Sequence, residues 1–182
     1  MGKRFEVITP ELAEWIKEQK MFFVATAPLD ANGHINCSPK GLDSFRIINE
    51  TTVAYQDITG SGIETISHLR ENKRIVIMFC AFEGPPKIVR LHGSGEVILT
   101  EDIEFTNFSE LFPPHQGVRA LIKILLDRIT DSCGFGVPLY DFRKDRDQME
   151  KWALAKGAEG LVDYRKEKNS SSIDGLSGLP QP

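Results

Sequence analysis

The residues best placed to do chemistry form a glycine-rich turn, Thr59-Gly60-Ser61-Gly62. Before the turn, Thr52–Asp57 combines β-branched, aromatic and polar residues and predicts a strand. After it, residues 63–69 place apolar side chains on one face of a short helix, and the apolar run Ile75–Phe82 predicts a buried strand. A turn between a strand and a helix start brings backbone N–H groups close to a ligand, often an anion. The sequence therefore predicts a ligand site at this turn.

The same turn also fits a helix cap. Ser61 and Glu64 match the capping-box pattern, in which Ser61 caps the helix and Glu64 reaches back to it. A carboxylate at this position would compete with an anion for the same N–H donors, so a bound phosphate would need a cation nearby. Helix capping alone would explain both residues, and the two interpretations stay open here.

The elements that position the turn are mostly short strands. Strands are predicted over residues 21–27, 34–40, 46–48, 52–57, 75–82 and 87–99, and helices over 10–20, 104–112 and 145–156. Asn32-Gly33 is a hairpin signal, and Pro39 places the returning strand at an edge or a bulge. Gly93 and Gly95 predict a bulge or a close backbone approach. Six or seven short strands with few helices indicate a small antiparallel barrel.

One segment is harder to assign. The Leu and Ile residues of Ala120–Thr130 recur at helical spacing, so periodicity predicts a helix, although the isoleucines and the Cys-Gly-Phe-Gly that follows favour a strand. The helix over 145–156 is expected to stop at Gly157. From Asn169 onward the chain is polar and rich in Gly and Ser, which predicts a flexible tail.

Composition and charge restrict the function. A chain of 182 residues suits one domain, and a net charge of −4 argues against bulk nucleic-acid binding. The densest basic run, Arg165–Lys168, predicts a solvated segment. Cys37, Cys80 and Cys133 lie far apart, form no zinc motif and fit a reducing compartment. With no apolar run long enough for a membrane span and no secretory signal, we expect a soluble, cytoplasmic protein without a metal site.

An ordered set of short motifs resembles the pyridoxamine 5′-phosphate oxidase-like family of FMN-binding split barrels. The motifs are Phe22–Ala27, Gly33, Cys37–Gly41, Val53–Asp57, Thr59–Thr65, His68-Leu69 and Asn72, and Ser132–Pro138 and Ser172–Leu176 resemble one branch of the family. The resemblance covers about residues 10–176. It implies a mainly β fold, a six-stranded antiparallel split β-barrel flanked by short helices, and it makes Ala120–Thr130 a strand. The domain is expected over 1–160, with an extension over 161–182 that is partly flexible or packed on a partner subunit.

The resemblance also implies a homodimer with FMN at the subunit interface. The positions that match cofactor-binding positions of the family are Ser38, Pro39, Lys40, Gly41, Tyr55, Asp57, Ser61, Gly62 and Thr65, with Arg90 as a further candidate. Better-known members carry an Arg-Lys pair where this chain has Gly62 and Ile63, which leaves Lys40 as the main candidate for the phosphate cation and Arg90 as the next. A cation near the N1 and C2 carbonyl edge of the flavin would stabilise its reduced anion, and Arg90 or Arg119 could supply it.

The resemblance implies an FMN-dependent oxidoreductase acting on a small organic substrate. Oxidation of pyridoxamine phosphate itself is not expected, because the oxidases of the family end in a segment bearing Trp and Arg, whereas the last aromatic residue here is Tyr164. The alternatives are a flavin-binding carrier or sensor without turnover and a related barrel that holds haem. Because the flavin supplies the redox chemistry, no dedicated acid–base pair is required.

Overall fold

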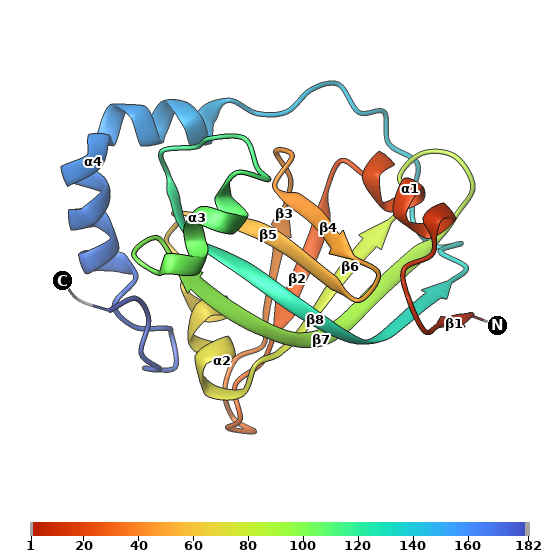
Figure 1. Cartoon of the computed structure of the whole chain (residues 1–182), viewed down its shortest axis with the longest axis horizontal. Helices are drawn as coiled ribbons and strands as arrows, with labels where there is room; N and C mark the ends of the chain where they lie inside the picture. The colour runs from red at the N-terminus through yellow and green to blue at the C-terminus, as the bar shows by residue number, and fades with distance from the viewer. Residues whose placement is uncertain (1, 181–182) are drawn as a thin grey trace.

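A long antiparallel sheet, rolled into a split barrel, forms most of the molecule (Figure 1). This computed structural model describes residues 2–180. The strands are β1 (Arg4–Phe5), β2 (Phe22–Thr26), β3 (Asn36–Lys40), β4 (Phe45–Asn49), β5 (Thr52–Ile58), β6 (Arg74–Cys80), β7 (Ile88–Leu99) and β8 (Val118–Ser132). The helices are α1 (Pro10–Glu18), α2 (Glu64–Asn72), α3 (Ile103–Ser109) and α4 (Gln148–Lys168).

The strand order is β3-β2-β6-β7-β8-β5-β4, and β1 pairs with β8. Within residues 2–180 the sheet thus counts eight strands, including the two-residue β1, where six were expected. The mainly β, split-barrel architecture is confirmed. The two ends of the strand path, β3 and β4, are joined by residues 41–44, so the part of the chain predicted to bind a ligand lies beside the open edge of the sheet.

Local sequence explains the edge strand β3. Within residues 2–180 it pairs only with β2, and Pro39 lies opposite Phe23 in that ladder. A proline cannot donate a ladder hydrogen bond, which is tolerated on an edge strand. The prediction that Pro39 marks an edge is therefore confirmed.

Residues 120–130, for which the spacing of Leu and Ile predicted a helix, belong to strand β8. It pairs with β5 on one side and β7 on the other. Ala120, Ile122 and Ile124 belong to the main core, whereas Leu121 belongs to a second cluster that α3 covers. A strand covered on both faces reads as a continuous apolar run instead of an alternating one. The helical spacing is thus coincidental, and the strand that the family resemblance implied is confirmed.

A register shift between His92 and Gly93 interrupts the β7–β8 ladder, as the glycines predicted. A Cβ at Gly93 would collide with the backbone carbonyl of Leu125. The close approach of two backbones therefore explains why residue 93 is a glycine.

The capping-box prediction at the glycine turn is wrong. The N-cap of α2 is Ile63, with no side-chain cap, so Ser61 lies two residues before the cap and Glu64 is the first helical residue. The carbonyl of Ser61 instead accepts a hydrogen bond from Asn169, 108 residues further along the chain. A long-range contact, which no local pattern encodes, holds the turn in another conformation.

The C-terminal part of the chain also differs from expectation. The helix begins at Gln148, breaks at Gly157 (φ 66°) and then continues to Lys168, so Gly157 produces a kink where a stop was predicted (Figure 1). Beyond it, Ser171 and Ser177 form a β-bridge, and Asn169 and Ser172 are buried. The expectation of a flexible tail is wrong for residues 169–179, which fold back against the body of the chain.

None of the helices over residues 2–180 combines the length and the apolar character needed to cross a lipid bilayer. Among the same residues, no three His, Cys, Asp or Glu side chains are grouped so as to hold a metal ion.

Candidate cofactor-binding site

The predicted turn opens onto a cavity of about 240 Å³. Most of its wall comes from the edge strand β3, the end of β5 and the start of α2, with single residues from β8 and α4. Its lining is Asn36, Ser38, Pro39, Lys40, Gly41, Leu42, Ser44, Gln56, Ile58, Gly60, Gly62, Glu64, Thr65, Arg119 and Met149. Polar side chains, backbone and two cations therefore converge at one end of the barrel.

The electrostatic centre of the site is the carboxylate of Asp57, which is fully buried. Lys40 Nζ lies 2.9 Å from one carboxylate oxygen, and Arg119 Nε lies 2.8 Å from the other. Burial alone would raise the pKa of Asp57, but the charges of Arg119 and Lys40 outweigh it and hold that pKa below its ordinary value. Two cations thus share one anion, and this group of three carries a net charge of +1.

Lys40 is the more accessible of the two cations. Its side chain is 21% exposed, against 5% for that of Arg119. Both line the cavity, whereas Asp57 lies beneath it. The positive charge is therefore on the cavity side, where it can act on a ligand.

The glycine turn supplies backbone donors. The carbonyls of Gly60 and Ser61 accept hydrogen bonds from the side-chain amide of Asn169 at 2.9 and 3.3 Å, and Gly60 also accepts one from Arg119 at 3.3 Å. Over residues 2–180, no acceptor is found for the backbone N–H groups of Ser61 and Gly62. Gly62 lines the cavity, so these groups are candidate donors for an anion there, although the carboxylate of Glu64 lies beside Gly62.

Polar side chains complete one wall. Asn36 Nδ2 donates to the hydroxyl of Thr65 at 3.0 Å, and the hydroxyl of Ser38 donates to Asn36 Oδ1 at 3.1 Å. Thr65 thus faces the site instead of bonding back to its own helix. The carboxylate of Glu64 also lines the cavity and accepts a weak hydrogen bond of 3.4 Å from the backbone N–H of Ile173. It is the one acidic group that an anion would have to avoid.

Tyr55 lies inside the barrel, below the cavity. It is fully buried, it packs edge-on against Phe22, and its hydroxyl has no hydrogen-bond partner among residues 2–180. Burial and the nearby Asp57 raise the pKa of Tyr55 well above its ordinary value, although Arg119 opposes this. Tyr55 is therefore a core residue here and does not line the cavity.

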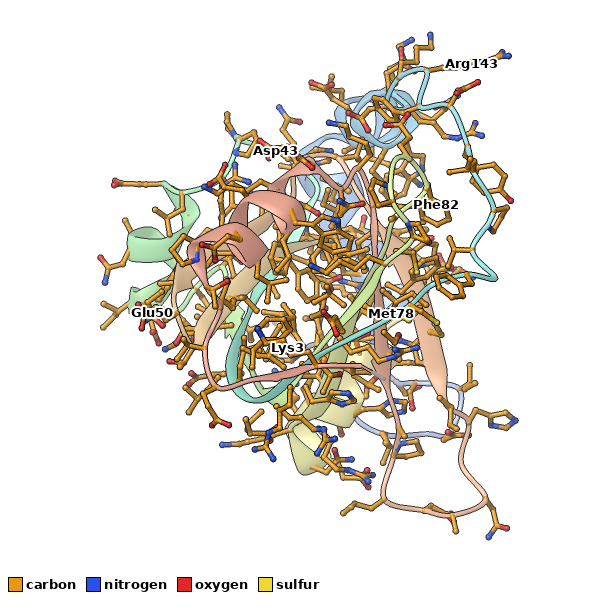
Figure 2. All side chains as sticks on the ribbon, turned by 90° about the vertical axis from the view of Figure 1, so that its right-hand side faces the viewer. Lys3, Asp43, Glu50, Met78, Phe82 and Arg143 are labelled. Atoms are coloured by element: carbon orange, nitrogen blue, oxygen red, sulfur yellow. The ribbon has the colours of Figure 1, made fainter. Side chains whose placement is uncertain are left out.

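A second, larger cavity of about 760 Å³ adjoins the first. The two share Met149 and residues 39–42. The outer wall of the larger cavity is formed by part of the crossing segment, the stretch 133–147 that links β8 to α4 across the molecule (Figure 1). Tyr140 of this segment stacks on Phe82 with ring centroids 5.5 Å apart, and Figure 2 shows Phe82 and Arg143 along the edge that the segment follows.

The structure brings most of the predicted site residues together. Ser38, Pro39, Lys40, Gly41, Gly62 and Thr65 line the smaller cavity, and Asp57 and Tyr55 lie beneath it. Ser61 is not among the lining residues; its carbonyl accepts a hydrogen bond from Asn169. Arg90 is not among the residues that line the cavity. It lies near the start of β7 and donates a hydrogen bond to the hydroxyl of Ser132 at 3.0 Å. Within this chain it does not reach the cavity.

Two residues near the site carried no usable sequence signal. Arg165 falls in the basic run that predicted a solvated segment, yet its Nε donates to the Thr59 hydroxyl at 2.9 Å. Burial lowers the pKa of Arg165, and repulsion from Arg119 lowers it further. Asn169 falls where a flexible tail was expected, yet it is completely buried against the turn. Each of these two hydrogen bonds joins residues that are more than 100 positions apart in the sequence.

Comparison with known proteins agrees with this architecture. A solved structure of HupZ from Group A Streptococcus is 28% identical, with a TM-score of 0.53, over 67% of this chain and 91% of that chain. An FAD-binding protein from Mesorhizobium loti shares the fold at 12% identity, with a TM-score of 0.50, over 72% of this chain and 96% of that chain. The pyridoxamine 5′-phosphate oxidase family protein ustO from Aspergillus flavus is 40% identical over 96% of this chain and 77% of its own length.

The family model described as pyridoxamine 5′-phosphate oxidase matches residues 8–133, which include every barrel strand except the two-residue β1. The matched range contains the glycine turn, Lys40, Asp57 and Arg119, which form the centre of the site. The sequence match, the ustO relative and the split-barrel fold agree, and the chain belongs to the pyridoxamine 5′-phosphate oxidase family.

Proposed function

We propose that this protein binds FMN in the cavity at the glycine turn and acts as an FMN-dependent oxidoreductase on a small organic substrate. The observation that carries the proposal is the combination of two free N–H groups with two cations that share one carboxylate. A phosphate monoester bears a charge of about −1.5 to −2 at pH 7. The net charge of +1 at Asp57, Lys40 and Arg119 complements such an anion, and the carboxylate of Glu64 in the cavity lining opposes it.

The residues present fit a flavin phosphate. Lys40 can hold the phosphate as a charged donor while Arg119 continues to neutralise Asp57, so no buried charge is left unpaired. The N–H groups of Ser61 and Gly62 and the hydroxyl of Thr65 supply further contacts. A cavity of about 240 Å³ suits one terminal phosphate with its ribityl chain, and FAD would have to carry its adenosine out through the mouth. These features favour FMN over FAD.

The larger cavity suits the flat flavin ring or the substrate beside it. Phe82, Tyr140 and Phe142 provide apolar surface, and charged side chains such as Lys20 and Glu83 stand at its edges. Binding sites for small organic molecules have this mixture of apolar walls and a few polar groups. Bound FMN supplies the electron transfer, while the chain's own residues hold the phosphate, orient the ring and limit the access of water.

We also propose that the protein works as a homodimer. Phe135, Leu139 and Tyr140 of the crossing segment are 81, 72 and 62% exposed. Neighbouring apolar side chains with such exposure are typical of surfaces that another chain covers. Light scattering in solution should give twice the chain mass of 20.4 kDa, and a monomer at all concentrations would contradict this part of the proposal.

The first experiment is the visible spectrum of the freshly purified protein, followed by titration with FMN, FAD and riboflavin. We expect a yellow protein that binds FMN more tightly than either of the other two, since riboflavin lacks the phosphate and FAD carries a bulky extension. Anaerobic NADPH should bleach the flavin bands if the protein turns over. Bands that resist both NADPH and NADH would indicate a flavin carrier or sensor, and a Soret band would indicate haem.

Lys40→Met tests the phosphate assignment directly. A charge-assisted hydrogen bond contributes about 1.5–3 kcal/mol, so the affinity for FMN should fall by about 10- to 150-fold. Riboflavin binding should change little, because it does not use the phosphate site. Lys17→Met is the matched control, since Lys17 is an exposed lysine of α1 paired with Glu14. Equal FMN affinity in the two variants would contradict the assignment.

A further inference from the structure

We propose that Asn169 is a positioning residue for the phosphate site: it holds the glycine turn in the conformation that presents its N–H groups to the cavity. The inference deepens the proposed function and rests on it. It also gives a role to the C-terminal segment after α4, which lies outside the range that the family model matches.

The contacts of Asn169 are unusually complete for a residue in a polar tail. The side chain is fully buried. Its Nδ2 donates to the carbonyls of Gly60 and Ser61, and its Oδ1 accepts from Arg119 Nη1 at 2.9 Å. Its backbone N–H donates to Arg165 O and its carbonyl accepts from Leu179 N, each at 2.8 Å. Every polar group of this residue therefore has a defined partner.

These contacts set the direction of the turn's N–H groups. In a trans peptide the C=O of one residue and the N–H of the next point in opposite directions. Because the carbonyls of Gly60 and Ser61 point toward Asn169, the N–H groups of Ser61 and Gly62 point away from it. Gly60 and Gly62 line the cavity, and the proposal places these N–H groups at its wall. Asn169 thus acts on the site through the turn, without touching the cavity itself.

The same side chain also orients one of the site's cations. Arg119 uses Nε for Asp57 and Nη1 for Asn169 and Gly60. The guanidinium is thereby fixed from both ends, between the buried carboxylate and the turn. Hydrogen bonds from one asparagine therefore hold both the glycine turn and the guanidinium of Arg119 in place.

Two further contacts tie the C-terminal segment to the same region. Arg165 donates to the hydroxyl of Thr59 and to the carbonyl of Val118, at 2.9 and 3.0 Å. At the other end of the segment, Arg70 of α2 donates to the carbonyl of Gly178. Asn169 thus lies between anchored points, which makes its side chain a rigid support for the turn.

The position of the turn matters for ligands that carry a phosphate and not for those that lack one. FMN and riboflavin share the ring and the ribityl chain and differ only in that group. A loss confined to FMN would therefore report on the turn, whereas a general loosening of the protein would affect both ligands. The ratio of the two affinities separates a positioning role from a merely structural one.

The test compares Asn169→Asp and Asn169→Leu with the wild type in full-length protein. Aspartate keeps the size and the acceptor for Arg119 but cannot donate to the two carbonyls, and leucine removes all side-chain hydrogen bonds. Both variants should bind FMN at least tenfold more weakly and riboflavin within twofold of the wild type, as measured by quenching of flavin fluorescence. Ser172→Ala, which alters a buried hydroxyl of the same segment that accepts from Leu176 N, should leave both affinities unchanged.

Equal losses for FMN and riboflavin, or no loss for either, would overturn the role of Asn169. If the leucine variant does not fold, Asn169→Ala replaces it, because aspartate also adds a negative charge beside Arg119 and would by that alone weaken FMN binding more than riboflavin binding. A wild-type protein that binds FMN no better than riboflavin would overturn the phosphate site itself. A wild-type preference for FMN that both Asn169 variants keep would overturn only the positioning role.

Discussion

Asp57→Asn is the perturbation that most directly tests the charge arrangement at the barrel end. The substitution keeps the shape of the side chain but removes the carboxylate that lies between Lys40 and Arg119. Arg119, with 5% of its side chain exposed, would then be a buried cation without a charged partner. Breaking a buried ion pair from one side typically costs about 3–5 kcal/mol. At about 2–4 °C per kcal/mol for a chain of this size, the midpoint of thermal unfolding should fall by about 6–20 °C.

The matched control is Asp43→Asn. Asp43 forms a comparable ion pair with Arg46 at 2.8 Å, but its side chain is 69% exposed. An exposed pair contributes only about 0–1 kcal/mol. Thermal and urea unfolding followed by circular dichroism should therefore show a large loss for Asp57→Asn and almost none for Asp43→Asn. Similar, small losses in both variants would refute the view that the buried trio is a tightly held electrostatic unit.

The pH dependence of stability, compared between the wild type and Asp57→Asn, gives a second readout. The folded pKa of Asp57 lies below the ordinary value of 3.8. Its stabilising contribution is therefore complete above that value and is lost as the pH falls through the folded pKa. The stability difference between wild type and Asp57→Asn should narrow progressively below about pH 4. A difference that stays constant down to the pH of acid unfolding would show that the carboxylate is not the source of the effect.

The remaining predictions concern the core. Burial lowers the pKa of His68 from 6.5, and its Nε2 has no partner among residues 2–180, so the unfolded chain takes up a proton at higher pH than the folded one. The free energy of unfolding of the wild type should therefore decline as the pH falls below about 6.5. The His68→Asn variant should be less stable at neutral pH but should lose less stability over the same pH interval. Parallel curves of stability against pH for the two proteins would contradict this. Gly93→Ala should lower the free energy of unfolding by about 1–3 kcal/mol, because a Cβ there meets the carbonyl of Leu125. Gly136→Ala, where a Cβ meets nothing within 4 Å, is the control and should change it by about 0.5 kcal/mol or less.

The sequence was most informative where local chemistry decides the structure. Pro39 at the sheet edge, the close approach at Gly93 and the glycine turn beside the cavity all follow from what a proline ring or a missing Cβ permits. Lys40 could be named as a site cation because it lies in a motif of the family, and the structure places it on the cavity.

Prediction failed where distant parts of the chain decide the outcome. Residues 120–130 have helical periodicity, and only the cover that α3 provides explains why both faces of a strand are apolar. Ser61 and Glu64 have the spacing of a helix cap, but Asn169 holds the turn in a different conformation. The polar composition around Asn169 is that of a solvated tail, and nothing within a short window indicates that its amide bonds to the glycine turn 109 residues away.

The pairing of β8 has a consequence for the order in which the protein can assemble. β8 is the last strand of the barrel in the chain, and it joins β1, β5 and β7 at once. A nascent chain therefore cannot close its barrel until residue 132 has left the ribosome, and contacts over such sequence distances form slowly. The support that Asn169 gives to the turn comes later still. Ligand affinity should thus be the last property that the newly made protein acquires, after its barrel has closed.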